Sequence, residues 1–432
     1  MTDLIARPVE KVNGVVKVPG DKSITHRAIL LGALAEGTSI IKERSQCRDC
    51  TASLNAIHAL GISTTVDGDD VLQIHGKGLQ GLTQPQATIN CMRSGTTMRL
   101  ITGILAGQEF NSTLSGDPQL NRRPMERVAK PLRDMGARIE TVDGHAPMTI
   151  TGSELTGIEH EIMLASAQVK SAILLAGLYA KNPTIVHQNP SVRDHTELLL
   201  KLMGVKLQVE ESLIKIEPSH PLMPFDITVP GDPSSAAFPL AAALLVPGSR
   251  ITCLNVNLNP TRCGFLDVLK EMGAWVKIDN LRTQGNELVG DIRVSSSTLR
   301  AISIKGDTVI RMIDEFPILA ILATQANGST MITDAAELRV KETDRIATLA
   351  EEITKLGAQV EVMEDGFIIT GPTPLTGSRV NSHGDHRLAM ALAIAGLIAR
   401  DETIIENCEC IPDSFPGFIE TMNAIGADYD QR

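Results

Sequence analysis

Aromatic residues are scarce in this sequence, and the balance of charge is acidic. Phe, Tyr and Trp make up only 3% of the 432 residues, which leaves little side-chain surface on which nucleic-acid bases can stack. The formal net charge of −11 disfavours long polyanions as well. A small anionic substrate stays open, because a cleft can concentrate cations inside an acidic protein. We expect no nucleic-acid partner.

Long apolar runs are also lacking. No uninterrupted apolar stretch reaches the roughly 20 residues of a membrane-spanning helix, and the N-terminal segment MTDLIARPVEKVNG has no signal-peptide core. We expect a cytoplasmic protein with no membrane partner.

The seven cysteines are an odd number scattered over a long chain, so they do not make a disulfide framework. Cys47 and Cys50 form a C-x-x-C pattern, but no second pair completes a zinc site and no thioredoxin-like context surrounds them. We expect both to be incidental, one at a helix start and one on its first turn.

Cofactor signatures are missing as well. The sequence has no Walker loop and no dinucleotide fingerprint, so neither ATP nor NAD is implied. His383 and His386 lack a third metal ligand in the local sequence. We expect no cofactor and no metal.

What the chain does contain is one pattern repeated six times. Half of each repeat is a helix that ends in an apolar residue and Gly and is followed by a strand. These six pairs are Leu60-Gly61, Met135-Gly136, Met203-Gly204, Met272-Gly273, Leu356-Gly357 and Ile425-Gly426. The other half is a strand, a polar turn and a small-residue helix, with turns near Asp21, Arg93, Ser166, Asp232, Asp314 and Asp385. Repeats that cannot bury their own apolar faces stack on their copies, so the period indicates an α/β architecture.

A chain of this length suggests two domains of about 200 residues each. Val18-Pro19-Gly20-Asp21-Lys22-Ser23 and Val229-Pro230-Gly231-Asp232-Pro233-Ser234 are near copies placed half a chain apart. We interpret them as the two crossings between domains. The first domain would span residues 20–230, and the second would combine residues 1–19 with 231–432, giving three repeats each. The small-residue helices are apolar on nearly every face, which is typical of helices at the centre of a domain.

The polar turns of the first domain predict anion-binding helix starts. In the first turn Lys22 and Ser23 precede Arg27, with Asp21 as the natural cap; the alternative is a capped helix with solvated basic residues. The second turn has Gly95 with two hydroxyl residues. Arg122-Arg123-Pro124 adds two guanidiniums at the expected start of another helix.

The third turn, Ser166-Ala167-Gln168, offers the neutral donors that a polyhydroxylated ring requires, and Arg193-Asp194-His195-Thr196-Glu197 follows it. The alternative for the latter segment is an exposed, charged helix start. The second domain supplies Asp314-Glu315, then Lys341-Glu342-Thr343-Asp344-Arg345, then Asp385-His386-Arg387.

We expect Lys341 and Arg345, four residues apart, to present two cations on one helical face without a matching acid, which favours an anionic ligand. If the two interdomain faces meet across a cleft, these cations form a pocket for one phosphate and a second ligand with both phosphate and carboxylate.

At this point the sequence resembles the 5-enolpyruvylshikimate-3-phosphate synthases over essentially its whole length. The matching motifs are Pro19-Gly20-Asp21-Lys22-Ser23, Ser94-Gly95-Thr96-Thr97, Ser166-Ala167-Gln168, Arg193-Asp194-His195-Thr196-Glu197, Asn259-Pro260-Thr261-Arg262, Lys341-Glu342-Thr343-Asp344-Arg345 and Asp385-His386-Arg387. Their forms are similar to the bacterial class II subgroup. The resemblance implies the two-domain inside-out α/β barrel, six βαβαββ repeats with three per domain, and an active site in the interdomain cleft.

The resemblance also implies transfer of the enolpyruvyl group of phosphoenolpyruvate to the 5-hydroxyl of shikimate 3-phosphate by addition and elimination, in the shikimate pathway. Carried over by position, shikimate 3-phosphate would contact Lys22, Ser23, Arg27, Ser166, Ala167, Gln168, Arg193, Asp314 and Lys341. Phosphoenolpyruvate would contact Lys22, Gly95, Arg123, Gln168, Arg345 and Arg387. Asp314 would take the hydroxyl proton, and Glu342, with Lys22, would handle the methylene proton. We expect a monomer, with glyphosate as a possible inhibitor.

Two positions depart from the family pattern. Met92-Arg93 stands where the family has Gly-Asn, and the segment Ile411-Pro412-Asp413 lacks a Lys that many members carry. We expect the second domain to bind phosphoenolpyruvate more weakly, and we expect Arg93 to offset this loss of binding. The alternatives are an enzyme that acts on UDP-N-acetylglucosamine, whose family pairs its Lys with Asn, and a non-catalytic descendant that binds shikimate 3-phosphate.

Overall fold

The computed structural model describes residues 2–68, 71–162, 165–188, 192–218 and 221–432. The chain divides into two compact units. The first unit consists of Gly20–Val229 and Gln284–Glu287, and the second consists of the residues up to Pro19, Pro230–Thr283 and Leu288–Arg432. The divisions therefore fall inside the two copied segments, and the four residues Gln284–Glu287 join the unit opposite to the one expected from the sequence.

The described residues of the first unit form three four-stranded sheets with one common strand order. The first two strands in each order are parallel, and the second and third are antiparallel. The orders are β14 (Asp226–Thr228), β3 (Glu36–Lys42), β5 (Val71–Lys77), β4 (Ser63–Asp67); β6 (Ile89–Asn90), β7 (Asn111–Ser115), β9 (His145–Thr151), β8 (Arg138–Val142); and β10 (Glu159–Ile162), β11 (Thr184–Gln188), β13 (Leu213–Ile216), β12 (Leu207–Val209).

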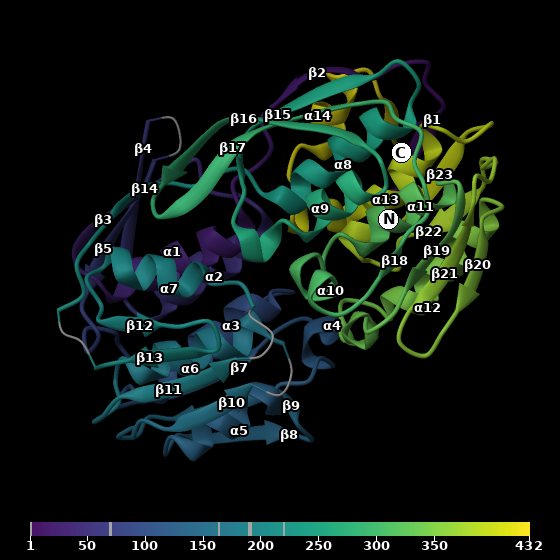
Figure 1. Ribbon diagram of the computed structural model, residues 1–432. Coiled ribbons are helices and arrows are strands. Elements are labelled where there is room, and N and C mark those ends of the chain that lie inside the picture. The colour runs from purple at the N-terminus through teal and green to yellow at the C-terminus, as the bar shows by residue number, and fades with distance from the viewer. Residues whose placement is uncertain (1, 69–70, 163–164, 189–191, 219–220) are drawn as a thin grey trace. The chain divides into compact units, whose positions relative to one another are not determined.

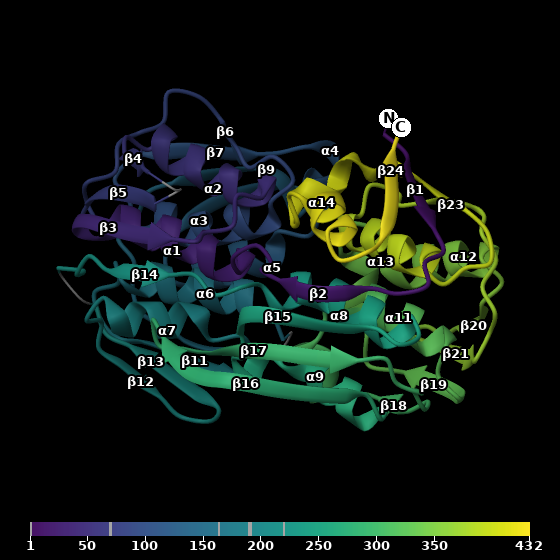
Figure 2. The same cartoon turned by 90° about the horizontal axis from the view of Figure 1, so that it is seen from above.

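The second unit repeats this arrangement in its described residues. The orders are β2 (Asn13–Val16), β15 (Arg250–Asn257), β17 (Glu287–Ser295), β16 (Trp275–Gln284); β18 (Ser303–Ile304), β19 (Gly328–Ile332), β21 (Phe367–Gly371), β20 (Gln359–Val362); and β22 (Arg379–Asn381), β23 (Thr403–Glu406), β1 (Leu4–Arg7), β24 (Asp428–Gln431). In the last sheet the N-terminal strand pairs with the C-terminal one, so the two chain ends lie side by side (Figure 2).

At each crossing the last strand before the helix pairs within the unit that the chain is leaving. Strand β2 directly precedes the first helix of the first unit, yet it pairs with β15 of the second unit. Strand β14 directly precedes the helix at Pro233, yet it pairs with β3 of the first unit. The exchange explains why the copied Pro-Gly segments stand where they do. At Gly20 a side chain would collide with the backbone, since an added Cβ would lie 2.2 Å from the Glu43 carbonyl oxygen.

Six inner helices form the centres of the two units, three in each (Figure 1). They are α1 (Lys22–Leu34), α3 (Gly95–Ala106) and α6 (Ala167–Gly177) in the first unit, and α8 (Pro233–Leu245), α11 (Phe316–Thr324) and α13 (His386–Gly396) in the second. Nearly every residue of these helices is buried. They pack on their own sheets and on one another. The sheets therefore lie outside the helices, as the repeat pattern predicted.

Outer helices complete the repeats and end as the sequence indicates. They are α2 (Arg48–Ala59), α5 (Glu126–Asp134), α7 (His195–Leu202), α9 (Gly264–Glu271), α12 (Arg345–Lys355) and α14 (Phe418–Asn423). The glycine that follows each one has a positive φ, between 81° at Gly61 and 105° at Gly426. Glycine adopts this left-handed conformation without strain, so the apolar-Gly pairs mark helix ends. No helix in the described part of the chain is long and apolar enough to cross a membrane.

Candidate active site

The inner helices begin at the predicted polar turns, and most of them are capped by a side chain from the turn. Asp21, Ser94, Ser166, Asp232 and Asp385 each accept a hydrogen bond from a backbone N–H of the first helical turn. Because the capping side chain already satisfies an N–H group of the first turn, the side chains just after it are not needed for capping and can contact a ligand. Lys22, Gly95, Ala167 and Gln168 occupy such positions in the first unit.

Lys22 is held by an acid that the sequence analysis did not single out. Its ammonium forms an ion pair with Asp49 in the first turn of α2, and both side chains are largely buried. The alternative of a solvated lysine is therefore wrong for Lys22. The sequence signal was slight, because an acidic residue in the first turn of a helix is usually explained by the helix dipole.

Arg27 is a buried cation whose hydrogen-bond partners are neutral. It donates to the Thr196 hydroxyl at 2.7 Å, to the Ser171 hydroxyl at 2.8 Å and to the Ser23 carbonyl oxygen at 2.9 Å. Burial lowers the pKa of Arg27 to about 10, with Glu197 opposing the shift and Arg193 adding to it. A buried guanidinium with neutral partners is stabilised by an added anion. Arg27 and the neighbouring Arg193 thus favour a phosphate.

The segment after Arg193 is buried, so the alternative of an exposed helix start is wrong. His195, Thr196 and Glu197 are each at most 2% exposed. Glu197 pairs at 2.5 Å with the fully buried Lys170, whose ammonium also donates to the Val192 carbonyl oxygen at 3.0 Å. These contacts fix the backbone that carries Arg193.

Gly95 lies against two guanidinium groups. An added Cβ would be 2.9 Å from an Nη1 atom of both Arg123 and Arg99. Arg99 donates to the Gln168 side-chain oxygen at 2.6 Å, and Gln168 donates to the Thr96 hydroxyl at 2.8 Å. The structure thus brings Gly95, Arg123 and Gln168 together as predicted, and it adds Arg99.

The prediction that Arg122 and Arg123 start a helix is wrong. They lie between α4 (Pro118–Asn121) and α5, which begins only at Glu126. The backbone N–H groups of Met125 and Glu126 donate to the carbonyl oxygen of Gly144 in a hairpin turn, so the chain is tied down before the helix begins. Nearby, Arg93 donates to the Gln119 side-chain oxygen in α4 at 2.9 Å. Its expected action on phosphoenolpyruvate stays a prediction.

In the second unit three arginines surround Asp314. Its carboxylate lies 3.7 Å from a guanidinium nitrogen of Arg262, 3.7 Å from one of Arg345 and 3.9 Å from one of Arg387. Arg387 also donates to the Asp314 carbonyl oxygen at 3.3 Å. Further acids share these arginines, since Asp232 and Glu315 lie near Arg262 and Glu342 and Asp385 pair with Arg345.

Arg345 is fully buried among acids. Its guanidinium pairs with Asp385 at 2.7 Å and with Glu342 at 2.7 Å. Burial alone would lower the pKa of Arg345, but Asp385, Glu342 and Asp314 together raise it above its usual value. Arg345 is therefore a permanent cation that also orients Glu342.

This arrangement contradicts the prediction for Lys341. Lys341 does not share a helical face with Arg345, because it follows the 3₁₀ helix η2 (Ala336–Val340) in an extended conformation, and α12 starts only at Arg345. The Asp344 side chain caps α12, so the helix begins after Asp344 and does not include Lys341. The expectation of two cations without a matching acid is also wrong: Arg345 has three acids nearby, and Lys341 lies 3.7 Å from Glu337.

Behind Asp314 lies a buried network that the sequence did not reveal. Arg262, in the 3₁₀ helix η1 (Pro260–Arg262), donates to the Ser234 hydroxyl at 2.7 Å and pairs with Asp232 at 3.3 Å. Ser234 in turn donates to Glu315. The Asn259-Pro260-Thr261-Arg262 motif could have indicated Arg262, but only the fold shows its partners. Asp413, at the position of the missing Lys, is buried.

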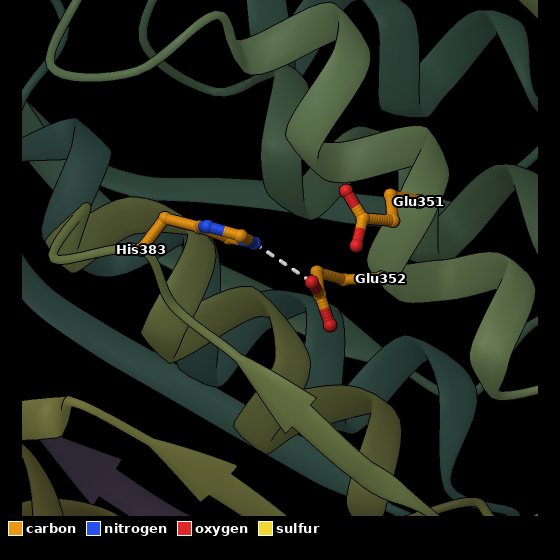
Figure 3. A group of neighbouring side chains, drawn as sticks. All are labelled: Glu351, Glu352 and His383. Atoms are coloured by element: carbon orange, nitrogen blue, oxygen red, sulfur yellow. Dashed lines mark hydrogen bonds and ion pairs between the residues drawn. The ribbon is translucent and has the colours of Figure 1, made fainter.

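One group in the described residues has the spacing of metal ligands. Glu351, Glu352 and His383 place their ligand atoms within 4.8 Å of one another (Figure 3). These partners of His383 are not local in the sequence, since the two acids come from α12. The Lys355 ammonium, however, contacts Glu352 at 2.8 Å and Glu351 at 3.1 Å. The two acids therefore already share a cation. Glu352 also accepts from the Asn381 N–H at 2.9 Å, so it anchors the turn before Asp385.

Comparisons with known proteins agree with this geometry. A model of the family "EPSP synthase (3-phosphoshikimate 1-carboxyvinyltransferase)" matches residues 6–422. The 3-phosphoshikimate 1-carboxyvinyltransferase of Desulforamulus reducens is 47% identical over 425 residues, which cover 98% of this chain and 99% of the relative. That of Bacillus pumilus is 48% identical over 415 residues, covering 95% and 96%. An EPSP synthase structure from Acinetobacter baumannii has a TM-score of 0.88 at 40% identity and covers 100% of both chains.

Fold and site together define an enolpyruvyl transferase built from six βαβαββ repeats. Within that class, the chain belongs to the EPSP synthase family.

Proposed function

We propose that this chain is a 3-phosphoshikimate 1-carboxyvinyltransferase. It moves the enolpyruvyl group of phosphoenolpyruvate to the 5-hydroxyl of shikimate 3-phosphate and releases phosphate, on the route to chorismate and the aromatic amino acids. The observation that carries the proposal is the full-length match to this family combined with a site in which Asp314, Glu342 and Lys22 are all retained.

Shikimate 3-phosphate is bound mainly by the first unit. Arg27 and Arg193 attract its phosphate, because both are cations and the hydrogen-bond partners of Arg27 among the described residues are neutral. The helix start at Ser166 presents hydroxyl and amide groups to the ring. The full set is Lys22, Ser23, Arg27, Ser166, Ala167, Gln168, Arg193, Asp314 and Lys341.

Phosphoenolpyruvate carries a phosphate and a carboxylate, and it takes guanidiniums from both units. Arg123 lies over Gly95 in the first unit, and Arg345 and Arg387 lie beside Asp314 in the second. The full set is Lys22, Gly95, Arg123, Gln168, Arg345 and Arg387. The reaction therefore requires residues of both units to reach the same substrates.

The chemistry follows from these groups. Asp314 accepts the proton of the 5-hydroxyl as its oxygen bonds to C2 of phosphoenolpyruvate, and Glu342, with Lys22, protonates the methylene carbon. In the second step a methyl proton returns to the protein while the bond between C2 and the phosphate oxygen breaks. Arg and Lys neutralise the departing phosphate. The contact between Glu342 and Arg345 keeps the carboxylate in place for both proton transfers.

The remaining expectations are parts of the same proposal: a cytoplasmic monomer, with glyphosate as a candidate inhibitor because it combines a phosphonate with a carboxylate. The guanidiniums of Arg123 and Arg99 that lie against Gly95 offer positive charge to such a molecule, and Met92 and Arg93 stand three and two residues before Gly95 in the chain.

The proposal is tested by phosphate release from shikimate 3-phosphate and phosphoenolpyruvate, with each substrate omitted in turn. Release that needs both substrates, with the enolpyruvyl product visible by ³¹P NMR, supports it. Binding of shikimate 3-phosphate without any release would show a descendant that lost the reaction. Release with UDP-N-acetylglucosamine in place of shikimate 3-phosphate would show the sister activity.

A further inference from the structure

Cys47 and Cys50 form a thiol pair at the start of α2. Cys47 occupies the N-cap position of the helix, and Cys50 lies in its first turn, as the sequence predicted. Both thiols are free and buried. Residues three apart across a first helical turn have Cα atoms about 5 Å apart, within the range that a disulfide spans.

The pair directly adjoins Lys22. The Cys50 thiol donates to the Lys22 carbonyl oxygen at 3.7 Å. Asp49, between the two cysteines, is the ion-pair partner of the Lys22 side chain. A covalent change at the two sulfur atoms therefore acts on both the backbone and the charge partner of Lys22.

The two cysteines have different environments. The neighbouring Cys50 thiol, with help from the charge of Lys22 and against the effect of burial, lowers the pKa of Cys47, whereas burial raises the pKa of Cys50. A helix N-terminus stabilises a thiolate further. Cys47 is thus the attacking sulfur, and Cys50 is the one that resolves the intermediate.

We propose that Cys47 and Cys50 are a redox modification site, at which a peroxide forms a reversible disulfide that lowers the activity of the enzyme. The Cys47 thiolate attacks one peroxide oxygen and breaks the O–O bond, giving a sulfenic acid and, after protonation, water. The Cys50 sulfur then attacks the Cys47 sulfur, and the hydroxyl leaves as water with the Cys50 proton. In total, two thiols and one hydrogen peroxide give one disulfide and two waters.

The proposal requires that a peroxide reach the pair. Cys47 and Cys50 are buried, and Gln46 and Arg48, on either side of Cys47, are exposed. Other cysteines are held as thiols, since burial raises the pKa of Cys91 to about 12 and that of Cys263 to about 11, and raises those of Cys253 and Cys408 too. Cys47 and Cys50 are the one C-x-x-C pair in the sequence, so we expect the disulfide to form there.

Oxidation should disturb Lys22 in two ways. The disulfide removes the hydrogen bond to the Lys22 carbonyl oxygen, and it tightens the turn that carries Asp49. A displaced catalytic group commonly costs a factor of ten or more in rate, so we expect about a tenfold loss of activity that a dithiol reverses. This loss rests on the proposed function, whereas the disulfide itself does not.

The test treats the reduced full-length protein with hydrogen peroxide, quenches with catalase, alkylates under denaturing conditions and maps the peptides by mass spectrometry. Phosphate release is measured on the same samples before and after dithiothreitol. The matched variants are Cys47→Ser, which places a residue suited to the N-cap position there, and Cys50→Ser. Circular dichroism checks that each variant is folded.

We expect the peptide with Cys47 and Cys50 to lose two hydrogens and resist alkylation while the other cysteines are alkylated. Activity should fall about tenfold in the parent, recover with dithiothreitol, and stay constant in Cys47→Ser. Absence of the disulfide at a peroxide dose that oxidises the unfolded chain would overturn the proposal. So would a disulfide without loss of activity, or an equal loss in both serine variants. Failure of the reduced parent to release phosphate would instead count against the proposed function.

Discussion

At the scale of single residues, the site depends on groups whose neighbours restrict them closely. Gly95 has no room for a side chain beside the guanidiniums of Arg123 and Arg99. His26, between Lys22 and Arg27 in α1, is fully buried and shares a hydrogen bond of 2.8 Å with the Ser53 hydroxyl. Each of these positions gives a specific prediction.

Gly95→Ala should weaken phosphoenolpyruvate binding. The added methyl would force the Arg123 guanidinium to move from a 2.9 Å approach, and Arg123 is proposed to hold that substrate. We expect the KM for phosphoenolpyruvate to rise about tenfold, equivalent to about 1.4 kcal/mol, with a larger rise for Gly95→Ser. Steady-state kinetics measures this, and calorimetry should show unchanged binding of shikimate 3-phosphate. An unchanged KM in both variants would contradict the placement of Arg123.

His26 should make the fold sensitive to mild acid. Burial, with Lys22 and Arg27 nearby, holds the pKa of His26 well below its usual value. As the pH falls below about 6.5, the unfolded chain binds a proton that the native protein excludes, so stability is lost on acidification. The loss is about 1.4 kcal/mol per pH unit until the native pKa is reached.

The variant His26→Asn removes this titration but can still hydrogen-bond Ser53. Urea unfolding at pH 7 and at pH 5.5 should therefore show that the parent loses about 1 kcal/mol more than the variant on acidification. Equal losses would mean that His26 is protonated in the native protein.

At the scale of elements, helix starts and turns position the charges. Helix α12 carries Arg345 at its N-terminus, and its next turns carry Glu352, which is fully buried and contacts Asn381 and His383. The turn at Asn381 leads directly to the cap Asp385 and to Arg387. Helix α12 therefore supplies Arg345 and supports the turn that leads to Arg387.

Glu352→Gln should loosen this turn. The amide keeps the shape of the side chain but leaves His383 and Lys355 without their shared carboxylate. We expect about a fivefold rise in the KM for phosphoenolpyruvate, near 1 kcal/mol, and unchanged affinity for shikimate 3-phosphate. The control is Glu351→Gln, because Glu351 is exposed and pairs only with Lys355 among the contacts seen. Equal effects of the two substitutions would refute an anchoring role for Glu352.

The elements also show where the sequence could be interpreted and where it could not. Helix ends and inner helices were predictable, because a positive-φ glycine and an all-apolar face have local causes. The position of Lys341 was not predictable. Its spacing of four residues from Arg345 suggested one helix for both, but Asp344 caps α12, which begins only at Arg345. Asp49 and Arg262 were missed as partners, since the residues they contact come from other helices.

At the scale of the whole molecule, the six repeats and the grouping of β2 with the second domain and β14 with the first followed from the sequence, but their partner strands β15 and β3 did not. Strand pairing at the crossings depends on which sheet offers an open edge, and the local sequence of two near-identical segments carries no such information. Lys22 lies just after the first crossing, and Asp314 lies in the unit that the second crossing enters.

The central claim is that Asp314, among three arginines, is the base of an enolpyruvyl transfer. The direct test is Asp314→Asn, which keeps size and hydrogen-bonding ability but removes the proton acceptor. Phosphate release should fall about a thousandfold, near 4 kcal/mol, while shikimate 3-phosphate still binds. The exposed Asp401→Asn should behave as the parent. A near-parental rate in Asp314→Asn would contradict the account.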